Sequence, residues 1–138
     1  MTTQIDLSEL QLSLLRALWD RGEATAAQVQ HALRSSRPLA ITTVQTLLAR
    51  LEKRGVVRHR SEGRGFIYRA RVTERDVRRR MLSGLVANLF RGEPSEVVEQ
   101  LLSHRDVSDG DIARIEELLR ENKRADGKKA REGRKGGR

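Results

Sequence analysis

The sequence predicts a mainly helical chain with one short β-hairpin, and three observations support this fold class. Apolar residues recur at spacings of three and four along most of the chain, as on one face of a helix. A glycine-rich segment at residues 61 to 65 lies between two runs with β-branched and aromatic residues, which favours a hairpin. Four stretches begin with the Ser or Thr pattern of a helix N-terminus, followed by Gln or Asp three residues later. These pairs are Ser8 and Gln11, Thr25 and Gln28, Thr73 and Asp76, and Ser108 and Asp111.

Two helices are predicted in the first part of the chain. The first begins at Ser8, carries leucines at helical spacing and ends at Gly22, a residue type that commonly ends helices. The second begins at Thr25 and ends before the Ser-Ser-Arg-Pro segment at residues 35 to 38. A short helix therefore follows the first one after a tight turn.

A third helix is predicted to open at Thr42 or Thr43, after residues 39 to 41, and to end before Gly55. Its apolar residues form one stripe, as do those of the two helices before it. Three helices with a single apolar stripe each can bury those stripes only against one another. The three helices are expected to form one small bundle.

The hairpin is predicted to pair residues 56 to 60 with residues 66 to 70. Three helices followed by a hairpin is the element order of a winged helix-turn-helix, in which the hairpin is called the wing. The sequence thus predicts a winged helix-turn-helix DNA-binding domain over residues 1 to 72. In this fold the third helix is the one that enters the major groove of DNA.

Three further helices are predicted over residues 73 to 122, starting near Thr73, Glu96 and Ser108. Such short amphipathic helices would leave apolar surface in water, and burial against a second copy of the chain removes that cost. We therefore predict a helical dimerisation domain and a homodimer. The candidate contacts are Leu85, Leu89, Val97, Val98, Leu101, Ile115 and Leu119.

Charge is distributed unevenly along the chain, whose formal net charge is +9. Residues 1 to 52 are neutral, residues 53 to 84 carry +8, residues 85 to 122 carry −5 and residues 123 to 138 carry +6. A basic block beside an acidic one indicates a localised surface for a polyanion. The middle of the chain is expected to face a phosphate backbone, unlike the helices after it.

The last segment, residues 123 to 138, is predicted to be a disordered basic tail because it lacks apolar residues other than alanine. Its cations are expected to add sequence-independent affinity for DNA, since each neutralised phosphate releases counterions. A solvated tail without consequence is the alternative. The cations concerned are Lys128, Lys129, Arg131, Arg134 and Lys135.

The side of the third helix opposite its apolar stripe is small, polar and basic. On a wheel that advances about 100° per residue, Thr42, Thr46 and Arg50 fall opposite Val44. Short threonines permit close approach to base edges, Gln45 can pair with adenine, and Arg50 can reach guanine or a phosphate. An ordinary solvated helix is the alternative, but a helix between a tight turn and a basic hairpin favours DNA binding.

The hairpin adds further basic candidates. Strand alternation places Arg58 and Arg60 on one face and His59 on the other. Arg64 lies at the tip between two glycines, which let the backbone approach a phosphate closely, although a flexible turn with a solvated arginine is the alternative. The predicted DNA-binding residues are Thr42, Thr43, Gln45, Thr46, Arg50, Lys53, Arg54, Arg58, Arg60 and Arg64.

The sequence predicts no enzyme, no metal site and no cofactor. There is no cysteine, and His31, His59 and His104 lie on different predicted elements without spaced ligand partners, so they are expected to be solvated. No nucleophile motif is present. No membrane insertion is predicted either, because no stretch approaches the roughly 20 apolar residues that a span needs. The expected location is the cytoplasm.

Several motifs resemble those of the penicillinase repressor family of bacterial regulators, which includes the methicillin-resistance and copper-homeostasis repressors. The most specific match is Thr-Val-Gln-Thr-Leu-Leu-Ala-Arg-Leu at residues 43 to 51, followed by Lys-Arg-Gly at residues 53 to 55. The resemblance covers nearly everything except the tail. It includes residues 7 to 10, Leu18 and Trp19, the hairpin residues 62 to 64 with Phe66 and Tyr68, and Val107, Ser108 and Ile112.

The resemblance implies a homodimeric repressor on a palindromic operator, released when a membrane sensor protease triggers its proteolysis in response to a cell-wall antibiotic. It also implies that Thr43, Thr46 and Arg50 read the operator. Copper-responsive members carry C-terminal cysteines, which this chain lacks, so that subtype is excluded. The Asn-Phe bond cleaved in antibiotic-responsive members aligns with Gln100-Leu101 in this chain. Release of the repressor from DNA by cleavage at another bond, or by another route, therefore stays open.

The remaining alternative is a winged helix that binds a protein partner, or that binds nucleic acid without sequence preference. A protein-interaction module has no need for a charge of +8 around the third helix and the hairpin. The sequence therefore favours a transcriptional repressor that binds double-stranded DNA.

Overall fold

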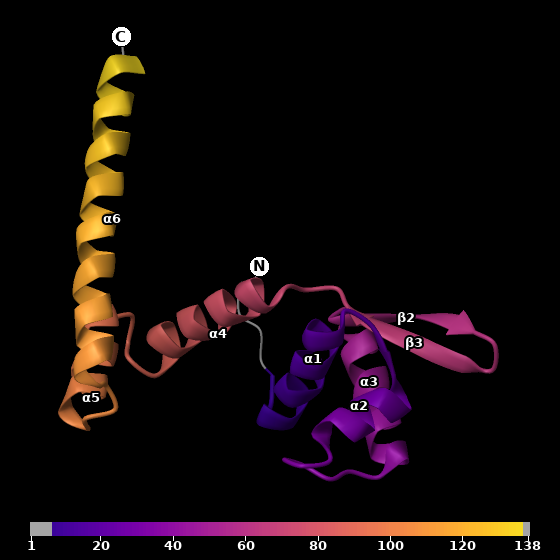
Figure 1. Cartoon of the computed structure of the whole chain (residues 1–138). Helices are drawn as coiled ribbons and strands as arrows, with labels where there is room; N and C mark the ends of the chain where they lie inside the picture. The colour runs from indigo at the N-terminus through magenta and orange to yellow at the C-terminus, as the bar shows by residue number, and fades with distance from the viewer. Residues whose placement is uncertain (1–6, 137–138) are drawn as a thin grey trace. The chain divides into compact units, whose positions relative to one another are not determined.

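The structure is a computed structural model that describes residues 7 to 136, with side chains described to Arg131 (Figure 1). Internal contacts divide the chain into two compact units, Met1–Arg91 and Gly92–Arg138. The predicted fold class, mainly helical with a small β-hairpin wing, is confirmed. The first unit contains α1 (Glu9–Arg21), β1 (Ala24–Thr25), α2 (Ala26–Leu33), α3 (Ile41–Lys53), β2 (Val57–Glu62), β3 (Gly65–Ala70) and α4 (Glu74–Asn88). The second contains α5 (Pro94–Ser103) and α6 (Asp109–Gly136).

Side-chain caps fix the starts of the first two helices. The Gln11 backbone N–H donates to Ser8 Oγ at 3.1 Å, and the Ser8 N–H donates to Gln11 Oε1 at 3.0 Å. Thr25 and Gln28 form the same reciprocal pair at 3.2 and 2.9 Å. Gly22 ends α1 with φ of 83°, a conformation that glycine adopts without strain. Both predicted starts and the predicted stop are confirmed.

Helix α3 begins slightly before its predicted start. Ile41 is its first residue and no side chain caps it, so the prediction that Thr42 or Thr43 opens the helix is wrong. The Gln30 side-chain amide donates to the Leu39 carbonyl at 2.9 Å and thereby fixes the segment that leads into α3. A tertiary contact replaces the expected threonine cap, and both threonines are exposed in the first turn.

The apolar stripes of α1, α2 and α3 meet in one core, as predicted. Val57 of β2 and Tyr68 of β3 close this core on the side of the hairpin. Burying an aliphatic side chain of this size is worth roughly 1.5–3 kcal/mol. The helical residues that are fully buried in it are Leu14, Leu15, Leu18, Val29, Val44, Leu48 and Leu51.

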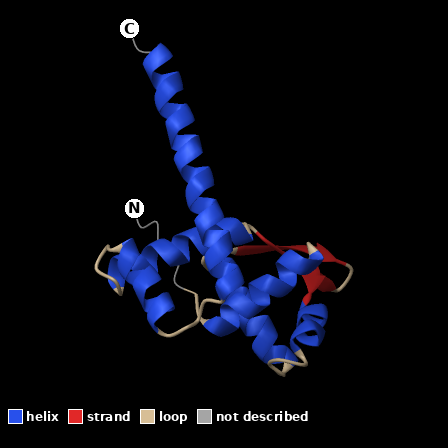
Figure 2. Ribbon diagram, turned by 60° about the vertical axis from the view of Figure 1, so that its left-hand side comes forward, coloured by secondary structure: helices blue, strands red, loops and turns tan. Residues whose placement is uncertain are grey.

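An antiparallel sheet of three strands, in the order β1-β3-β2, belongs to the first unit (Figure 2). Strand β1 pairs Ala24 with Tyr68 and Thr25 with Ile67. The sequence did not predict this strand, because two residues are too few to show a period of two. It anchors the wing to the turn between α1 and α2.

The predicted hairpin is confirmed, with longer strands and a tighter turn than expected. Glu62 pairs with Gly65, so Gly63 and Arg64 alone form the turn. Gly63 has φ of 61°, which a two-residue hairpin turn commonly requires and glycine supplies. Arg64 is therefore held at the tip of the regular hairpin formed by β2 and β3, which Figure 1 shows.

Helix α4 belongs to the first unit. Val77 is 1% exposed in the shared core, and Trp19 Nε1 donates to the Val72 carbonyl at 2.9 Å. The boundary between the compact units lies after Arg91, beyond the end of α4. The boundary predicted from the sequence, after residue 72, lies before the start of α4. The difference arises because the first turn of α4 packs on the winged-helix core.

The second unit holds two helices without a core of their own. None of residues 92 to 131 is buried. The Ser108 backbone N–H donates to Asp111 Oδ2 at 3.0 Å, and the Asp111 N–H donates to Ser108 Oγ at 3.1 Å, which confirms the predicted cap of α6. The bonds from Ser108, its backbone N–H first, hold the pKa of the Asp111 carboxyl below its ordinary value. Exposed large apolar residues are Val98, Leu101, Leu102, Ile112, Ile115, Leu118 and Leu119.

Helix α6 continues to Gly136, so the predicted disordered tail from residue 123 is wrong in this structure. Lys, Arg, Ala and Glu have high helix propensity, and a helix that has begun adds residues at little cost. The side chains of residues 123 to 131 are exposed. Arg134 and Lys135, which were predicted to contact phosphates, lie beyond the residues whose side chains are described.

Candidate nucleic-acid interface

Helix α3 presents its predicted polar side to solvent. Thr46 Oγ1 donates to the Thr42 carbonyl at 2.9 Å. The lone pairs of Thr46 Oγ1 and the methyl group of Thr46 therefore stay available to a base. The opposite side of the helix is held in the core by Val44, Leu48 and Leu51. This packing fixes which residues face outward. The exposed candidates on α3 are Thr42, Thr43, Gln45, Thr46, Arg50 and Lys53.

The C-terminal end of α3 is basic. Arg50 and Lys53 lie in the last turn, where cations interact favourably with the helix dipole. Arg54 follows as the C-cap, and its Nη1 donates to Gln11 Oε1 at 3.5 Å. Lys53 and Arg54 are both exposed, and the guanidinium of Arg54 also contacts α1.

The N-terminal part of α3 and the tip of the wing line one hollow of about 320 Å³. Gln45 contributes from α3, and Arg64 and Phe66 contribute from the wing. The structure therefore brings together Gln45 and Arg64, two candidates that the sequence placed on separate elements. We call this hollow the wing–α3 groove. It is lined by Thr25, Ala26, Ala27, Ile41, Gln45, Arg64, Gly65, Phe66 and Tyr68.

Phe66 is a groove residue that was not among the predicted DNA-binding residues. Its side chain is 48% exposed, and its ring centroid lies 4.1 Å from that of His59 and 6.3 Å from that of Tyr68. An exposed phenyl ring held in this way can contact a thymine methyl group. Its sequence signal, an aromatic residue at a strand start, is equally typical of a core residue, and only the fold separates the two cases.

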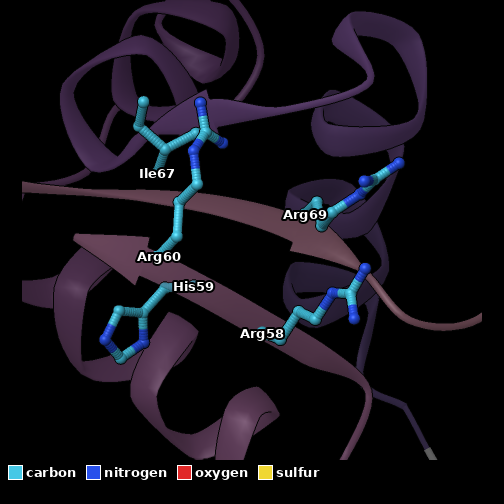
Figure 3. A pocket seen from close by; sticks show the side chains of 5 residues that line it. All are labelled: Arg58, His59, Arg60, Ile67 and Arg69. Carbon is cyan, nitrogen blue, oxygen red and sulfur yellow. The ribbon is translucent and has the colours of Figure 1, made fainter. Parts of the chain in front are cut away.

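The other face of the wing carries the remaining predicted arginines (Figure 3). Arg60 Nη1 donates to Glu23 Oε2 at 2.7 Å, and Arg60 Nη2 donates to Glu62 Oε2 at 3.1 Å. The hydrogen bond from Arg60 lowers the pKa of the Glu23 carboxyl, and the same bond raises the pKa of Arg60. The charge of Arg60 is thus already balanced within the chain. We call this surface the outer face of the wing, formed by Arg58, Arg60, Ile67 and Arg69.

A brace between Glu52 and His59 links α3 to the wing. Glu52 Oε1 accepts the His59 backbone N–H at 2.9 Å and also contacts His59 Nδ1. His59 is exposed, as predicted, but its ring also packs on Phe66. Tyr68 is buried beside the brace, and burial, followed by the charge of Glu52, raises the pKa of its phenol. The brace sets the orientation of the wing relative to α3.

The site offers hydrogen-bond donors and positive charge on a helix and a hairpin. Among residues 7 to 136, no group of three or more His, Asp or Glu side chains is placed to hold a metal ion. Over the same range, no helix is long and apolar enough to cross a membrane. Exposed Thr, Gln and Arg side chains on a third helix, with an arginine at a hairpin tip, suit the phosphates and base edges of nucleic acid. The fold and the site define a winged helix-turn-helix DNA-binding protein.

The chain belongs to the penicillinase repressor family, whose model matches residues 7 to 121. This confirms the family that the sequence motifs indicated, a family of DNA-binding transcriptional repressors. The chain is 25% identical over 117 residues to the penicillinase repressor of Bacillus licheniformis, covering 85% of this chain and 91% of that protein. It is 20% identical over 114 residues to the methicillin resistance regulatory protein MecI of Mammaliicoccus sciuri, and the match covers 83% of this chain and 93% of that protein.

Solved structures similar to this chain include the DNA-binding domain of the repressor BlaI. That solution structure shares 30% sequence identity and a TM-score of 0.47, covering 55% of this chain and 90% of that chain. The monomeric form of Bacillus licheniformis BlaI, in complex with the blaP half-operator, is 29% identical with a TM-score of 0.46. The match covers 52% of this chain and 88% of that chain.

Proposed function

We propose that this chain represses transcription as a homodimer bound to a palindromic operator, with α3 in the major groove and Arg64 on the adjacent backbone or in the minor groove. The observation that supports this most is the wing–α3 groove, because it joins Gln45 of α3 and Arg64 of the wing tip in one surface. One recognition helix reads only a few base pairs, and dimers double the site by placing half-sites about one helical turn apart.

Within this proposal the residues of α3 divide into two roles. Thr43, Gln45, Thr46 and Arg50 read base edges, with Thr42 beside them. Lys53 and Arg54, at the end of the helix, position the protein on phosphates. On the wing, Arg64 is the principal contact, while Arg60 contributes less because Glu23 and Glu62 already bind it.

The partner that covers the exposed apolar residues is a second copy of the chain. Leu82, Leu85 and Leu89 at the end of α4 are 54%, 41% and 68% exposed, and both helices of the second unit have exposed leucine or isoleucine side chains. Isolated apolar residues on a surface are ordinary, but two helices without a buried residue from position 92 to position 131 are typical of an obligate interface. The predicted dimer contacts are exposed, except Val97, which is half-buried.

The operator test is a gel shift with DNA from upstream of the chain's own gene, in the presence of competitor DNA and at two salt concentrations. We expect a shift that survives competitor and depends on the palindrome. Arg50→Ala should weaken binding by about 10-fold or more, the effect of losing a base contact worth roughly 1–3 kcal/mol. Arg16→Ala removes the same charge from an exposed position on α1 and serves as the matched control.

A binding module without sequence preference predicts a different result in the same experiment. Its shift would disappear with competitor DNA, and Arg50→Ala and Arg16→Ala would weaken it equally. A protein-interaction module would give no shift at either salt concentration. Either outcome would overturn the proposal.

The basic end of α6 is proposed to add affinity without sequence preference. Lys128, Lys129 and Arg131 are exposed on a helix, so their charges are spread along one rigid element. Deleting residues 123 to 138 should reduce the slope of log affinity against log salt, because fewer counterions are released. An unchanged slope would show that this segment does not contact DNA.

Release is proposed to follow a signal from a membrane sensor protease. Gln100 and Leu101 lie inside α5, and a protease would have to unwind this helix to cut between them. Incubation of the chain with the sensor encoded nearest its gene, followed by mass spectrometry of the products, tests cleavage directly. An intact chain under inducing conditions would refute a proteolytic route.

A further inference from the structure

Two arginines occupy opposite register positions on the two strands of the wing, on the side away from α3. Arg58 of β2 is the register partner of Arg69 of β3. Both side chains are exposed, and both project from the outer face of the wing (Figure 3). Like charges placed directly opposite on one face of a sheet are destabilising. An anion bound between the two guanidinium groups would relieve this repulsion.

The carboxylates near this pair are already bound to another arginine. Glu23 accepts hydrogen bonds from Arg60 at 2.7 and 3.2 Å, and Glu62 accepts one at 3.1 Å. Arg69 is close enough to Glu23 to lower the pKa of its carboxyl, but only as the weakest of the contributions. Among the side chains described, those of residues 7 to 131, no carboxylate forms an ion pair with Arg58 or Arg69.

The space beside the pair is separate from the wing–α3 groove. A hollow of about 270 Å³ is lined by Arg58, His59, Arg60, Ile67 and Arg69. Strand alternation directs Tyr68 toward the core and the groove, whereas its neighbours Ile67 and Arg69 face the outer hollow. The wing itself therefore lies between the two hollows, and an anion in the outer one cannot be a phosphate that α3 contacts.

We propose that Arg58 and Arg69 form a phosphate-binding site on the outer face of the wing. A planar guanidinium can bind two phosphate oxygens at once, so two facing guanidinium groups can hold one phosphate between them. Ile67 supplies the apolar wall of the hollow. The phosphate belongs either to the DNA backbone beyond the base pairs that α3 reads or to a free phosphorylated compound.

The first test uses inorganic phosphate and the full chain without DNA, so it does not depend on the proposed operator binding. The Arg Nε–Hε resonances are followed by NMR during a phosphate titration, with chloride at matched ionic strength as the reference. We expect saturable shifts for Arg58 and Arg69. Arg69→Gln should abolish the shift of Arg58, whereas Arg78→Gln, which removes an exposed arginine paired with Glu74 on α4, should leave it intact.

The second test distinguishes a DNA phosphate from a free one, and this arm rests on the proposed function. The salt dependence of binding is measured on a duplex limited to the operator and on one extended by about one helical turn, roughly 10 base pairs, on each side. If the site binds backbone phosphate, Arg69→Gln should lower the slope of log affinity against log salt by about 1, and only on the long duplex. Arg78→Gln should not change the difference between the two duplexes.

Each outcome of the pair of tests is decisive. Saturable phosphate shifts without a change in slope would support the site with a free phosphate compound as its ligand. A change in slope on the long duplex would support it with the DNA backbone as its ligand. The absence of both effects, the saturable phosphate shifts and the change in slope, would overturn the proposal. The Arg69→Gln variant is expected to melt at the wild-type temperature or above it, because the substitution removes a like-charge pair. Failure of the wild-type chain to bind operator would refute the proposed function but leave the phosphate titration valid.

Discussion

The two compact units differ most in what they bury. Among the residues whose burial is described, 7 to 131, every buried hydrophobic residue lies between Leu7 and Val77 and belongs to the first unit. The second unit also has amphipathic helices, yet none of its residues up to Arg131 is buried. The first unit completes its core within one chain, whereas the apolar side chains described in the second unit all stay at least partly exposed.

The cause of this difference is connectivity. In the first unit, α1, α2 and α3 enclose one another and the sheet closes the core through Val57 and Tyr68. In the second unit, α5 is followed by one long helix whose large apolar residues end before residue 120. Two helices offer too few faces to enclose a core, so the apolar stripes stay exposed.

The largest expected effect is the loss of stability when the first core is opened. Leu48 is fully buried, and Leu48→Ala should lower the free energy of unfolding by about 2–5 kcal/mol. Trp19 is the only tryptophan and packs against the same core, so its fluorescence during urea unfolding reports this unit alone.

Leu118→Ala is the matched control, because the same side chain is 46% exposed in the second unit. At protein concentrations that favour the monomer, its effect on urea unfolding, followed by circular dichroism so that both units are observed, should stay within about 0.5 kcal/mol. Equal losses for the two variants would contradict the distinction between a closed and an open unit.

The second effect in size concerns assembly. Leu101 is 43% exposed on α5, and Leu101→Asp should raise the dissociation constant of the dimer by about 10-fold or more, since a charge would enter the apolar interface. Sedimentation equilibrium measures this constant. Gln100→Asp adds the same charge one residue away and should change it much less. A dimer that is unaffected by Leu101→Asp would remove α5 from the interface.

Sequence reasoning succeeded where a feature depends on neighbouring residues. The caps at Ser8, Thr25 and Ser108 were predicted because a side chain bonds to the backbone three residues away. The start of α3 was missed because Gln30, distant in sequence, fixes the segment before it. The continuation of α6 was missed because a charged composition was taken to mean disorder, although the same residues favour a helix.

The candidate site shows the same contrast between features set within one element and features that join different elements. The exposed side of α3 was predicted from a helical wheel, since only the period of the helix is needed. The wing–α3 groove and the Glu52 brace were not predicted, because each joins residues of different elements. Arg69 was overlooked for the same reason, as its partner Arg58 is identified only by the strand register.

A smaller effect is expected at the contact that ties α4 to the first unit. Trp19→Phe keeps an aromatic ring but removes the donor to the Val72 carbonyl, which should cost about 1 kcal/mol. Circular dichroism during urea unfolding measures the loss, because the variant has no tryptophan. Amide exchange in the first turn of α4 should also accelerate. Unchanged exchange there would show that Val77 alone holds the helix in place.

The smallest expected effect is a dependence on pH at the contact between the α1–β1 turn and the wing. The hydrogen bond from Arg60 lowers the pKa of Glu23 below its ordinary value of 4.5 in the folded chain. The contribution of Glu23 to stability is therefore fully present above that ordinary value, and it is lost as the pH falls through the lowered pKa of the folded state.

Unfolding of the wild type and of Glu23→Gln should accordingly be compared across this acidic range. The wild type should be the more stable chain above pH 4.5, and the difference should shrink as the pH falls below it. Arg60→Gln serves as the control, because it removes the same hydrogen bond and should make the chain insensitive to the further change Glu23→Gln. A difference that persists unchanged through the acidic range would mean that the Glu23 carboxylate does not hold the wing, leaving β1 as the main anchor between the turn and the sheet.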